Sequence, residues 1–341
     1  MTLTVEEELK QDSSFQDRWW RLNNLYRIID KKGKDIVCKF NAAQIFLFNN
    51  LHTRNIILKA RQLGFTTSIC LIFLDEVMFR SNVTAAIIAD TEDNAKQIFK
   101  RIKYAFNHLD PGVKKAFNIR LLTDSTEEMA FSNGSSIRVA TSVRGGTINL
   151  LHISEYGKIC KAYPEKAEEI KLSGFPAVPE TGIIFVESTA VESIGYFYDL
   201  FQESNDKAPA TKLNFKAFFF PWWQDPTYRI KTRIEIDKKL EKYFDDLAKR
   251  GIELDQEQKN WYAVQHHNFK DKVKQEYPSY AEEAFETSGN KMFDLEVVRT
   301  MQAEHRKVSF DFRDNGHLKI FENYVKGERY GLGADVGEGI E

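Results

Sequence analysis

Apolar and polar positions divide much of the chain into short hydrophobic runs, each followed by a polar or glycine-containing loop. A run of this length without an exposed polar face is typical of a strand that is buried on both sides of a sheet. Such runs occupy residues 56–58, 83–89, 148–155 and 182–186. We therefore expect a sheet built mainly from these strands and covered on both faces.

Helical patterns alternate with these runs. Apolar residues recur at helical spacing over residues 68–79 and again over 91–109, where Thr91 is the predicted N-cap and acidic residues fill the first turn. Alternation of strand and helix predicts parallel strands joined by right-handed crossovers. The sequence therefore indicates an α/β fold.

Three further segments complete the predicted elements. Residues 15–30 have an aromatic, partly amphipathic pattern that predicts one helix, and a second short helix is expected after residues 39–44. Residues 129–141 predict a β-hairpin, because the turn dipeptide Asn133-Gly134 separates two short apolar stretches.

Composition narrows the class of protein. With 341 residues and 42% hydrophobic content, the chain can form a large core and about two domains. A net charge of −2 gives no global basic field, so any contact with nucleic acid must be local. Cys38, Cys70 and Cys160 suit a reducing cytosol and form no metal pattern. Without a secretory signal or an apolar stretch of ~18–20 residues, we expect a soluble intracellular protein with no membrane partner.

The candidate chemistry begins in residues 54–67, RNIILKARQLGFTT, where the first strand passes through a tight loop into its helix. A loop of this build directs backbone N–H groups and a helix N-terminus at an anion. In the pattern GxxxxGK(S/T), Gly64 stands at the second glycine and Thr66 at the hydroxyl that binds Mg²⁺. The segment predicts a phosphate-binding loop, with an ordinary strand–loop–helix as the alternative.

The loop departs from that pattern in its cations. Phe65 occupies the position of the lysine, whereas Lys59 occupies the position of the first glycine and Arg61 follows shortly after. Because both cations belong to one loop, we expect them to neutralise phosphate charge from its other side.

A carboxylate ends the third apolar run. Glu155 stands at the end of a strand in a sheet that already has a phosphate loop, so it could orient or deprotonate the water that attacks a γ-phosphate. The expected pair is Asp-Glu, with the Asp serving Mg²⁺; Ser154 stands in its place as a weaker, uncharged ligand. The alternative is a loop or helix-start carboxylate.

One further residue and one short segment each have two interpretations. The amide of Gln44 can pair with the edge of adenine, or it can be a solvated residue at a helix start. Small hydroxyl residues after the fourth run can sense whether γ-phosphate is present, or they can simply cap the next helix. The hydroxyl residues are Ser188 and Thr189, and Ala190 follows them.

Together these motifs resemble those of the large terminase subunits, which package DNA in tailed bacteriophages. ILKARQLGFTT resembles their altered Walker A loop with the lysine shifted to its start, and LLHISEYGKI their Walker B strand in the variant with Ser before Glu. FNAAQ resembles the adenine-contacting Q motif, and VESTAVESIGYFYDLF the coupling motif with the helix after it. FFFPWWQDPTY and QEYPSYAEEAFETSGNKMFD resemble the segment that joins ATPase and nuclease. The resemblance runs from about Trp20 to the C-terminus.

The resemblance implies ATP and Mg²⁺ as cofactors and suggests a role for each candidate residue. Gln44 would contact adenine, Glu155 would be the catalytic carboxylate, and Thr66 and Ser154 would hold Mg²⁺. The coupling segment, which would link hydrolysis to movement, would consist of Ser188, Thr189 and Ala190. The phosphates would be held by Lys59, Ala60, Arg61, Gln62, Leu63, Gly64, Phe65, Thr66 and Thr67.

Two further residues take a role from the resemblance alone. Arg144 matches an arginine that in some members acts across a ring on the ATP of the neighbouring subunit; a loop arginine that binds a carboxylate or DNA phosphate in cis is the alternative. Residues 329–339 resemble the first strand of an RNase H-like nuclease, with Asp335 as its first metal-binding carboxylate. Two-metal cleavage needs several carboxylates, and the sequence ends at Glu341, so we expect no nuclease activity.

The expected fold is an ASCE-type P-loop NTPase, an α/β protein with a central, mainly parallel sheet flanked by helices and a small helical linker or lid subdomain. We place the ATPase core in residues 1–230, the linker or lid in 231–325, and the truncated start of the nuclease in 326–341.

The expected function is an ATP-hydrolysing motor that translocates double-stranded DNA into the procapsid, in the cytoplasm of the infected bacterial host. Its implied partners are DNA, the portal protein of the procapsid and the small terminase subunit. It would form a homo-oligomeric ring on the portal, or be a monomer in isolation. Two alternatives stay open. One is a helicase-like translocase, which should carry a second motor domain. The other is a nucleotide-binding assembly module whose hydrolysis is disabled by Phe65 and Ser154.

Overall fold

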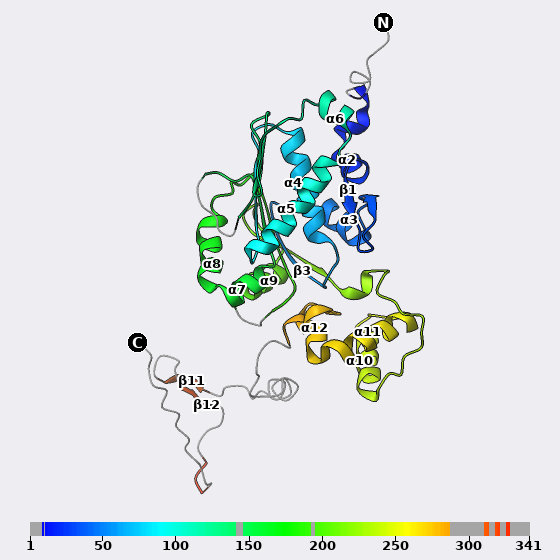
Figure 1. Ribbon diagram of the computed structural model, residues 1–341. Helices are drawn as coiled ribbons and strands as arrows, with labels where there is room; N and C mark the ends of the chain where they lie inside the picture. The colour runs from blue at the N-terminus through cyan, green and yellow to red at the C-terminus, as the bar shows by residue number, and fades with distance from the viewer. Residues whose placement is uncertain are drawn as a thin grey trace. The chain divides into compact units, whose positions relative to one another are not determined.

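A computed structural model describes residues 9, 11–140, 146–191 and 195–286 and the short segments 310–313, 318–320 and 325–327 (Figure 1). Contacts divide the chain into two compact units, Met1–Gly289 and Asn290–Glu341. The helical segment after residue 230 therefore belongs to the unit that holds the sheet. The domain boundaries after residues 230 and 325 stay predictions.

The first unit is built on an eight-stranded sheet with the strand order β10-β3-β9-β8-β4-β7-β6-β5. The strands from β10 to β7 are parallel to one another, and β6 and β5 continue the sheet antiparallel. The bounds are β3 Arg54–Lys59, β4 Thr84–Ile88, β5 Leu121–Asp124, β6 Glu128–Phe131, β7 Ser136–Ala140, β8 Leu150–Ser154, β9 Ile183–Ser188 and β10 Lys216–Phe220. All four predicted strands and the predicted hairpin are confirmed.

The position of β9 decides how the site is assembled. It lies between β3 and β8 and pairs with both in parallel, although the chain passes through β4 and β8 before it reaches β9. In this register Leu58 of β3 lies opposite Ser188, and Ser154 of β8 lies opposite Glu187. Because the carboxyl ends of parallel strands share one edge, the ends of β3, β9 and β8 meet there.

Helices cover both faces of this sheet, with α4 and α5 on one face and α7, α8 and α9 on the other (Figure 1). The α-helices of the sheet-bearing part are α2 Arg18–Asn24, α3 Ala42–Asn49, α4 Phe65–Phe79, α5 Glu92–Asn107, α6 Pro111–Ala116, α7 Tyr156–Ala162, α8 Pro164–Glu169 and α9 Tyr196–Asp206. The helical segment after β10 holds α10 Lys238–Lys249, α11 Gln256–Phe269 and α12 Val273–Glu276. The 3₁₀ turns are Ser13–Gln16, Trp222–Gln224, Lys270–Lys272 and Glu282–Phe285, and a π-helical turn spans Ile170–Gly174.

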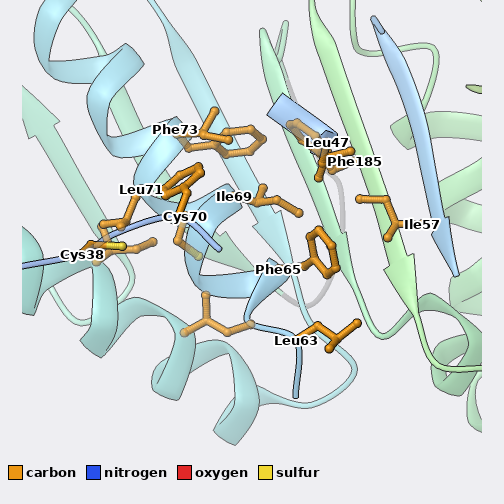
Figure 2. Packing of buried hydrophobic residues seen from close by; sticks show 14 of the residues in the cluster. Cys38, Leu47, Ile57, Leu63, Phe65, Ile69, Cys70, Leu71, Phe73 and Phe185 are labelled. Carbon is orange, nitrogen blue, oxygen red and sulfur yellow. The ribbon is translucent and has the colours of Figure 1, made fainter. Parts of the chain in front are cut away.

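Strand β3 is buried on both faces, as its continuous apolar run predicts. Ile57 belongs to the hydrophobic cluster under α4 and α5, whereas Ile56 and Leu58 belong to the cluster under α7, α8 and α9. Successive side chains of a strand point to opposite faces, which explains this division. Figure 2 shows Phe65 of α4 and Phe185 of β9 in the first cluster, beside Ile57.

The single helix predicted for residues 15–30 is wrong. Helix α2 ends at Asn24, and the chain then forms a small antiparallel hairpin of β1 Arg27–Ile29 and β2 Asp35–Val37. Gly33 has φ +75° in the turn, where its N–H donates to the carbonyl of Asp30. The β-branched residues of β1 and a glycine at positive φ favour the hairpin over further helix.

The second unit contains one described hairpin, β11 Phe310–Arg313 and β12 Leu318–Ile320, whose strands pair antiparallel.

A buried ion pair anchors α2 to α4, and we expect its loss to cost about 3–5 kcal/mol. The carboxylate of Asp75 is fully buried and accepts from Arg21 Nε at 2.9 Å, Arg21 Nη2 at 2.6 Å and the Tyr26 hydroxyl at 2.6 Å. Asp75→Ala leaves the guanidinium buried without its counter-ion, and denaturant unfolding measures the loss. Asp246→Ala, which removes the carboxylate of an exposed pair, should leave the midpoint nearly unchanged. A similar small effect for Asp75→Ala would contradict the prediction.

Candidate functional site

The loop that is predicted to bind phosphate, residues 59–67, joins β3 to α4 and depends on Gly64. This residue is the N-cap of α4, which begins at Phe65 rather than at the predicted residue 68, and has φ +80°. A Cβ there would lie 2.8 Å from Nε2 of Gln44. The backbone conformation therefore requires glycine, and a larger residue would also displace the Gln44 amide.

Gln44 lies against this loop, in the first turn of α3. Its Oε1 accepts from the backbone N–H of Asn41 at 3.0 Å, and its Nε2 donates to the carbonyl of Gly64 at 2.9 Å. The side chain is 9% exposed, so the interpretation as a solvated residue does not hold. Gln44 positions the loop; its contact with adenine stays a prediction.

Lys59, the last residue of β3, lies between two carboxylates. Its Nζ is 3.2 Å from Oε2 of Glu187 and 3.4 Å from Oε1 of Glu155, and the residue is 5% exposed. Burial alone would lower the pKa of Lys59, but the charges of Glu187 and Glu155 outweigh it and hold the pKa above its usual value. A buried cation therefore stands at the start of the phosphate loop.

Glu187 is the functional candidate that the sequence analysis missed. It is fully buried on β9, and its Oε1 accepts from Thr66 Oγ1 at 2.5 Å and from Ser154 Oγ at 3.1 Å, with His152 Nε2 at 3.3 Å. Burial raises the pKa of Glu187, but Lys59 and the hydrogen bonds outweigh burial and hold the pKa well below its usual range. The available signal was a glutamate that directly follows the apolar run of residues 182–186, inside a strand with no exposed face.

Glu155 follows β8 in a left-handed conformation, with φ 58° and ψ 43°. Non-glycine residues rarely occupy this region, and such strain is concentrated at functional sites. Its Oε1 lies 3.4 Å from Nζ of Lys59 and its Oε2 lies 3.1 Å from Nζ of Lys158. The carboxylate is thus held at the mouth of the loop, between two cations.

Arg61, the second cation of the loop, and Phe65, at the usual position of the lysine, do not contact Glu155 or Glu187 in the described contacts. Phe65 is 1% exposed, and its ring centroid lies 4.4 Å from that of Phe220, so it contributes packing. The Arg61 guanidinium pairs with Glu276 at 3.2 Å, at the end of α12. The Arg61 N–H donates to the carbonyl of Glu276, and its carbonyl accepts from the hydroxyl of Tyr228. The helical segment after β10 therefore holds the loop backbone.

The remaining loop residues differ in burial. Ala60 and Leu63 are buried, and the Ala60 N–H donates to the carbonyl of Phe220. Gln62 is exposed in a left-handed conformation with φ 61°, and Thr67 is half-buried in the first turn of α4. Their contact with phosphate stays a prediction.

The predicted coupling segment touches the element that follows Glu155. Ser188, Thr189 and Ala190 are all buried, and Ser188 Oγ accepts from the backbone N–H of Gly157 in α7 at 3.1 Å. A Cβ on Gly157 would lie 2.9 Å from this hydroxyl, so glycine permits the close approach. A displacement at the end of β9 would therefore also move the start of α7.

Three side chains with oxygen atoms that could bind Mg²⁺ meet beside the loop: Thr66, Ser154 and Glu187. The Thr66 and Ser154 hydroxyls both donate to the Glu187 carboxylate, and hard oxygen ligands are those that Mg²⁺ prefers. Among the described residues no cluster of three or more His, Cys, Asp or Glu side chains could hold a metal by itself. The predicted sites Arg144 and Asp335 lie outside the described residues.

Comparison with known proteins supports the fold. No family model matches the chain, and no curated protein does. Among solved structures, the HK97 bacteriophage large terminase matches with a TM-score of 0.50 at 13% identity, over 76% of this chain and 54% of that chain. This likeness is one of fold, and the fold is that of a phage large terminase. The predicted class, an α/β P-loop NTPase, is confirmed.

Two other solved structures are similar at lower scores. The large terminase ATPase domain of Thermus phage P74-26 matches with a TM-score of 0.45 at 16% identity, over 70% of this chain and 92% of that chain. A DEAD box protein from Methanococcus jannaschii matches with a TM-score of 0.36 at 13% identity, over 60% of this chain and 55% of that chain.

Within the described part of the chain, no helix combines the length and the apolarity that a membrane crossing requires.

Proposed function

We propose that this chain is the ATPase of a terminase motor, which hydrolyses ATP to move double-stranded DNA into a procapsid. One observation carries the proposal: Lys59 at the end of β3 lies within 3.4 Å of two carboxylates, Glu187 on the adjacent strand β9 and Glu155 directly after β8, the next strand in the sheet. A cation, a loop that leads into a helix N-terminus, and a carboxylate at a strand end are the parts that phosphoryl transfer needs.

In this proposal, the loop and Lys59 bind the phosphates. The N-terminus of α4 carries the positive end of its dipole, and Lys59 adds a full charge beside it. A nucleotide phosphate would compete with Glu155 and Glu187 for the same ammonium group. Binding would therefore change the surroundings of both carboxylates.

The hydroxyls of Thr66 and Ser154 are the groups proposed to hold Mg²⁺, through the metal itself or through its water. When bound, Mg²⁺ neutralises charge on the β- and γ-phosphate oxygens. Glu155 would orient the attacking water and accept its proton, because its carboxylate is partly exposed, at 21%, beside the loop.

The partners are proposals as well. In a ring of identical chains on a portal, with the small terminase subunit and double-stranded DNA, the catalytic sites would lie at subunit interfaces. Arg144 would then reach the ATP of its neighbour, as an arginine finger does.

A mixing experiment tests the motor and the arginine together. We expect Mg²⁺-dependent ATP hydrolysis per chain to rise with protein concentration, and Arg144→Ala and Glu155→Gln each to lose at least ~10²-fold. A mixture of these two inactive variants should regain activity, because an intact Arg144 from one chain can serve an intact Glu155 in its neighbour. Arg120→Ala, which removes an exposed arginine, is the matched control. No recovery on mixing would mean that Arg144 acts in cis.

The same assay separates the alternatives. An assembly module would bind ATP without turnover at any concentration. A helicase-like translocase would be stimulated by single-stranded rather than by double-stranded nucleic acid.

A further inference from the structure

The strand that ends in Ser154 lacks an acidic group at the place where one is expected. In P-loop NTPases, Mg²⁺ is held by the hydroxyl of the loop Ser or Thr and by a carboxylate at the end of a nearby strand. Thr66 supplies the hydroxyl here, but the Ser154 side chain carries no charge.

Glu187 brings a carboxylate to this place from the neighbouring strand. Its Oε1 lies 2.5 Å from Thr66 Oγ1 and 3.1 Å from Ser154 Oγ, so one oxygen contacts both hydroxyls. The register explains this contact, because Ser154 of β8 is the direct partner of Glu187 on β9. Glu187 is fully buried, and among the described residues its other oxygen has no hydrogen-bond donor beyond the ammonium of Lys59 at 3.2 Å.

Serine at position 154 is compatible with this arrangement, and aspartate would not be. An aspartate there would place a second buried carboxylate beside Glu187, and two adjacent carboxylates cannot both ionise without cost. A serine instead donates a hydrogen bond to Glu187. The two positions therefore form an exchanged pair, with the charge on β9 and the hydroxyl on β8.

We propose that Glu187 is the acidic Mg²⁺-binding residue of this site and replaces the aspartate that is absent from position 154. Glu187 contacts the metal directly or through its water, next to the hydroxyl of Thr66. This inference rests on the proposed nucleotide site and adds a residue to it.

A purely structural role makes a different prediction. If Glu187 only neutralises Lys59, its loss changes stability and phosphate affinity equally with and without metal. If it holds Mg²⁺, its loss acts on the metal dependence of nucleotide binding. The metal dependence is therefore the quantity to measure.

The test titrates Mg²⁺ into the full chain with the fluorescent, slowly hydrolysed analogue mant-AMPPNP. We expect Glu187→Gln to raise the Mg²⁺ concentration at half-maximal binding at least ~10-fold. The double variant Glu187→Gln/Ser154→Asp should restore it to near the wild-type value, because the carboxylate returns on the adjacent strand. Glu283→Gln is the matched control, since Glu283 is also fully buried but bonds to Tyr243 and Ser279 in the helical segment.

Two results would overturn the inference. One is a Glu187→Gln variant that binds the analogue with the wild-type Mg²⁺ dependence. The other is a double variant that folds, with a melting temperature near that of wild type, but whose Mg²⁺ dependence is not restored. This second measurement tests the inference even if Glu187→Gln alone does not fold. Wild-type protein that binds no analogue at any Mg²⁺ concentration would instead refute the proposed function itself.

Discussion

Lys59→Met will abolish measurable nucleotide binding and destabilise the protein by about 3–5 kcal/mol. Methionine is unbranched and only one atom shorter than lysine, so the change removes the charge with little change in packing. Glu187 is fully buried and would lose its ammonium partner at 3.2 Å, and a buried charge without a counter-ion is strongly destabilising. The loss of binding follows because Lys59 is the buried cation at the loop.

The two effects of Lys59→Met can be separated with a second substitution. The double variant Lys59→Met/Glu187→Gln carries no buried charge at this pair, so denaturant unfolding should return most of the lost free energy while ATP binding stays absent. Lys249→Met, which removes an exposed lysine on α10, should change neither quantity. If the double variant is no more stable than Lys59→Met alone, the ion pair does not account for the loss.

Glu155→Gln will bind ATP with near wild-type affinity but hydrolyse it about 10²–10⁴-fold more slowly. The substitution keeps the shape of the side chain and removes only its capacity to accept a proton. Glutamine also meets the same backbone requirement, since the residue stands at φ 58° and either side chain is equally strained there. Equilibrium binding and single-turnover hydrolysis measure the two steps independently.

The control for this prediction is Glu165→Gln, an exposed carboxylate on α8, which should leave both steps unchanged. A wild-type rate in Glu155→Gln would show that another group activates the water. A variant that neither binds nor hydrolyses ATP would assign Glu155 to binding through Lys59, which it contacts at 3.4 Å.

The fold class followed from the sequence because its evidence is local. A continuous apolar run such as residues 56–58 must be buried on both faces, and strands that alternate with helices are joined by right-handed crossovers in one parallel sheet. The prediction failed over residues 15–30, where apolar and aromatic residues at roughly helical spacing fit a helix as well as a helix followed by a hairpin. Pairing of Arg27–Ile29 with Asp35–Val37 decided that segment.

The candidate site was partly predictable for the same reason. Lys59 and Glu155 stand at the ends of apolar runs, and the ends of parallel strands meet at one edge of the sheet. The orientation of Arg61 toward Glu276 was not predictable, because it depends on a residue that is distant in the chain. The partnership of Gln44 with the loop likewise depends on how α3 packs beside Gly64.

The sequence by itself determined the buried strands, the glycine-dependent loop at Gly64 and the acidic residue at the end of β8, because each depends on residues that are close together in the chain. Only the tertiary structure decided that β9 lies between β3 and β8. That order places Glu187 against Lys59, Thr66 and Ser154. Strand order arises from packing between segments that are far apart in the chain, and no local pattern records it.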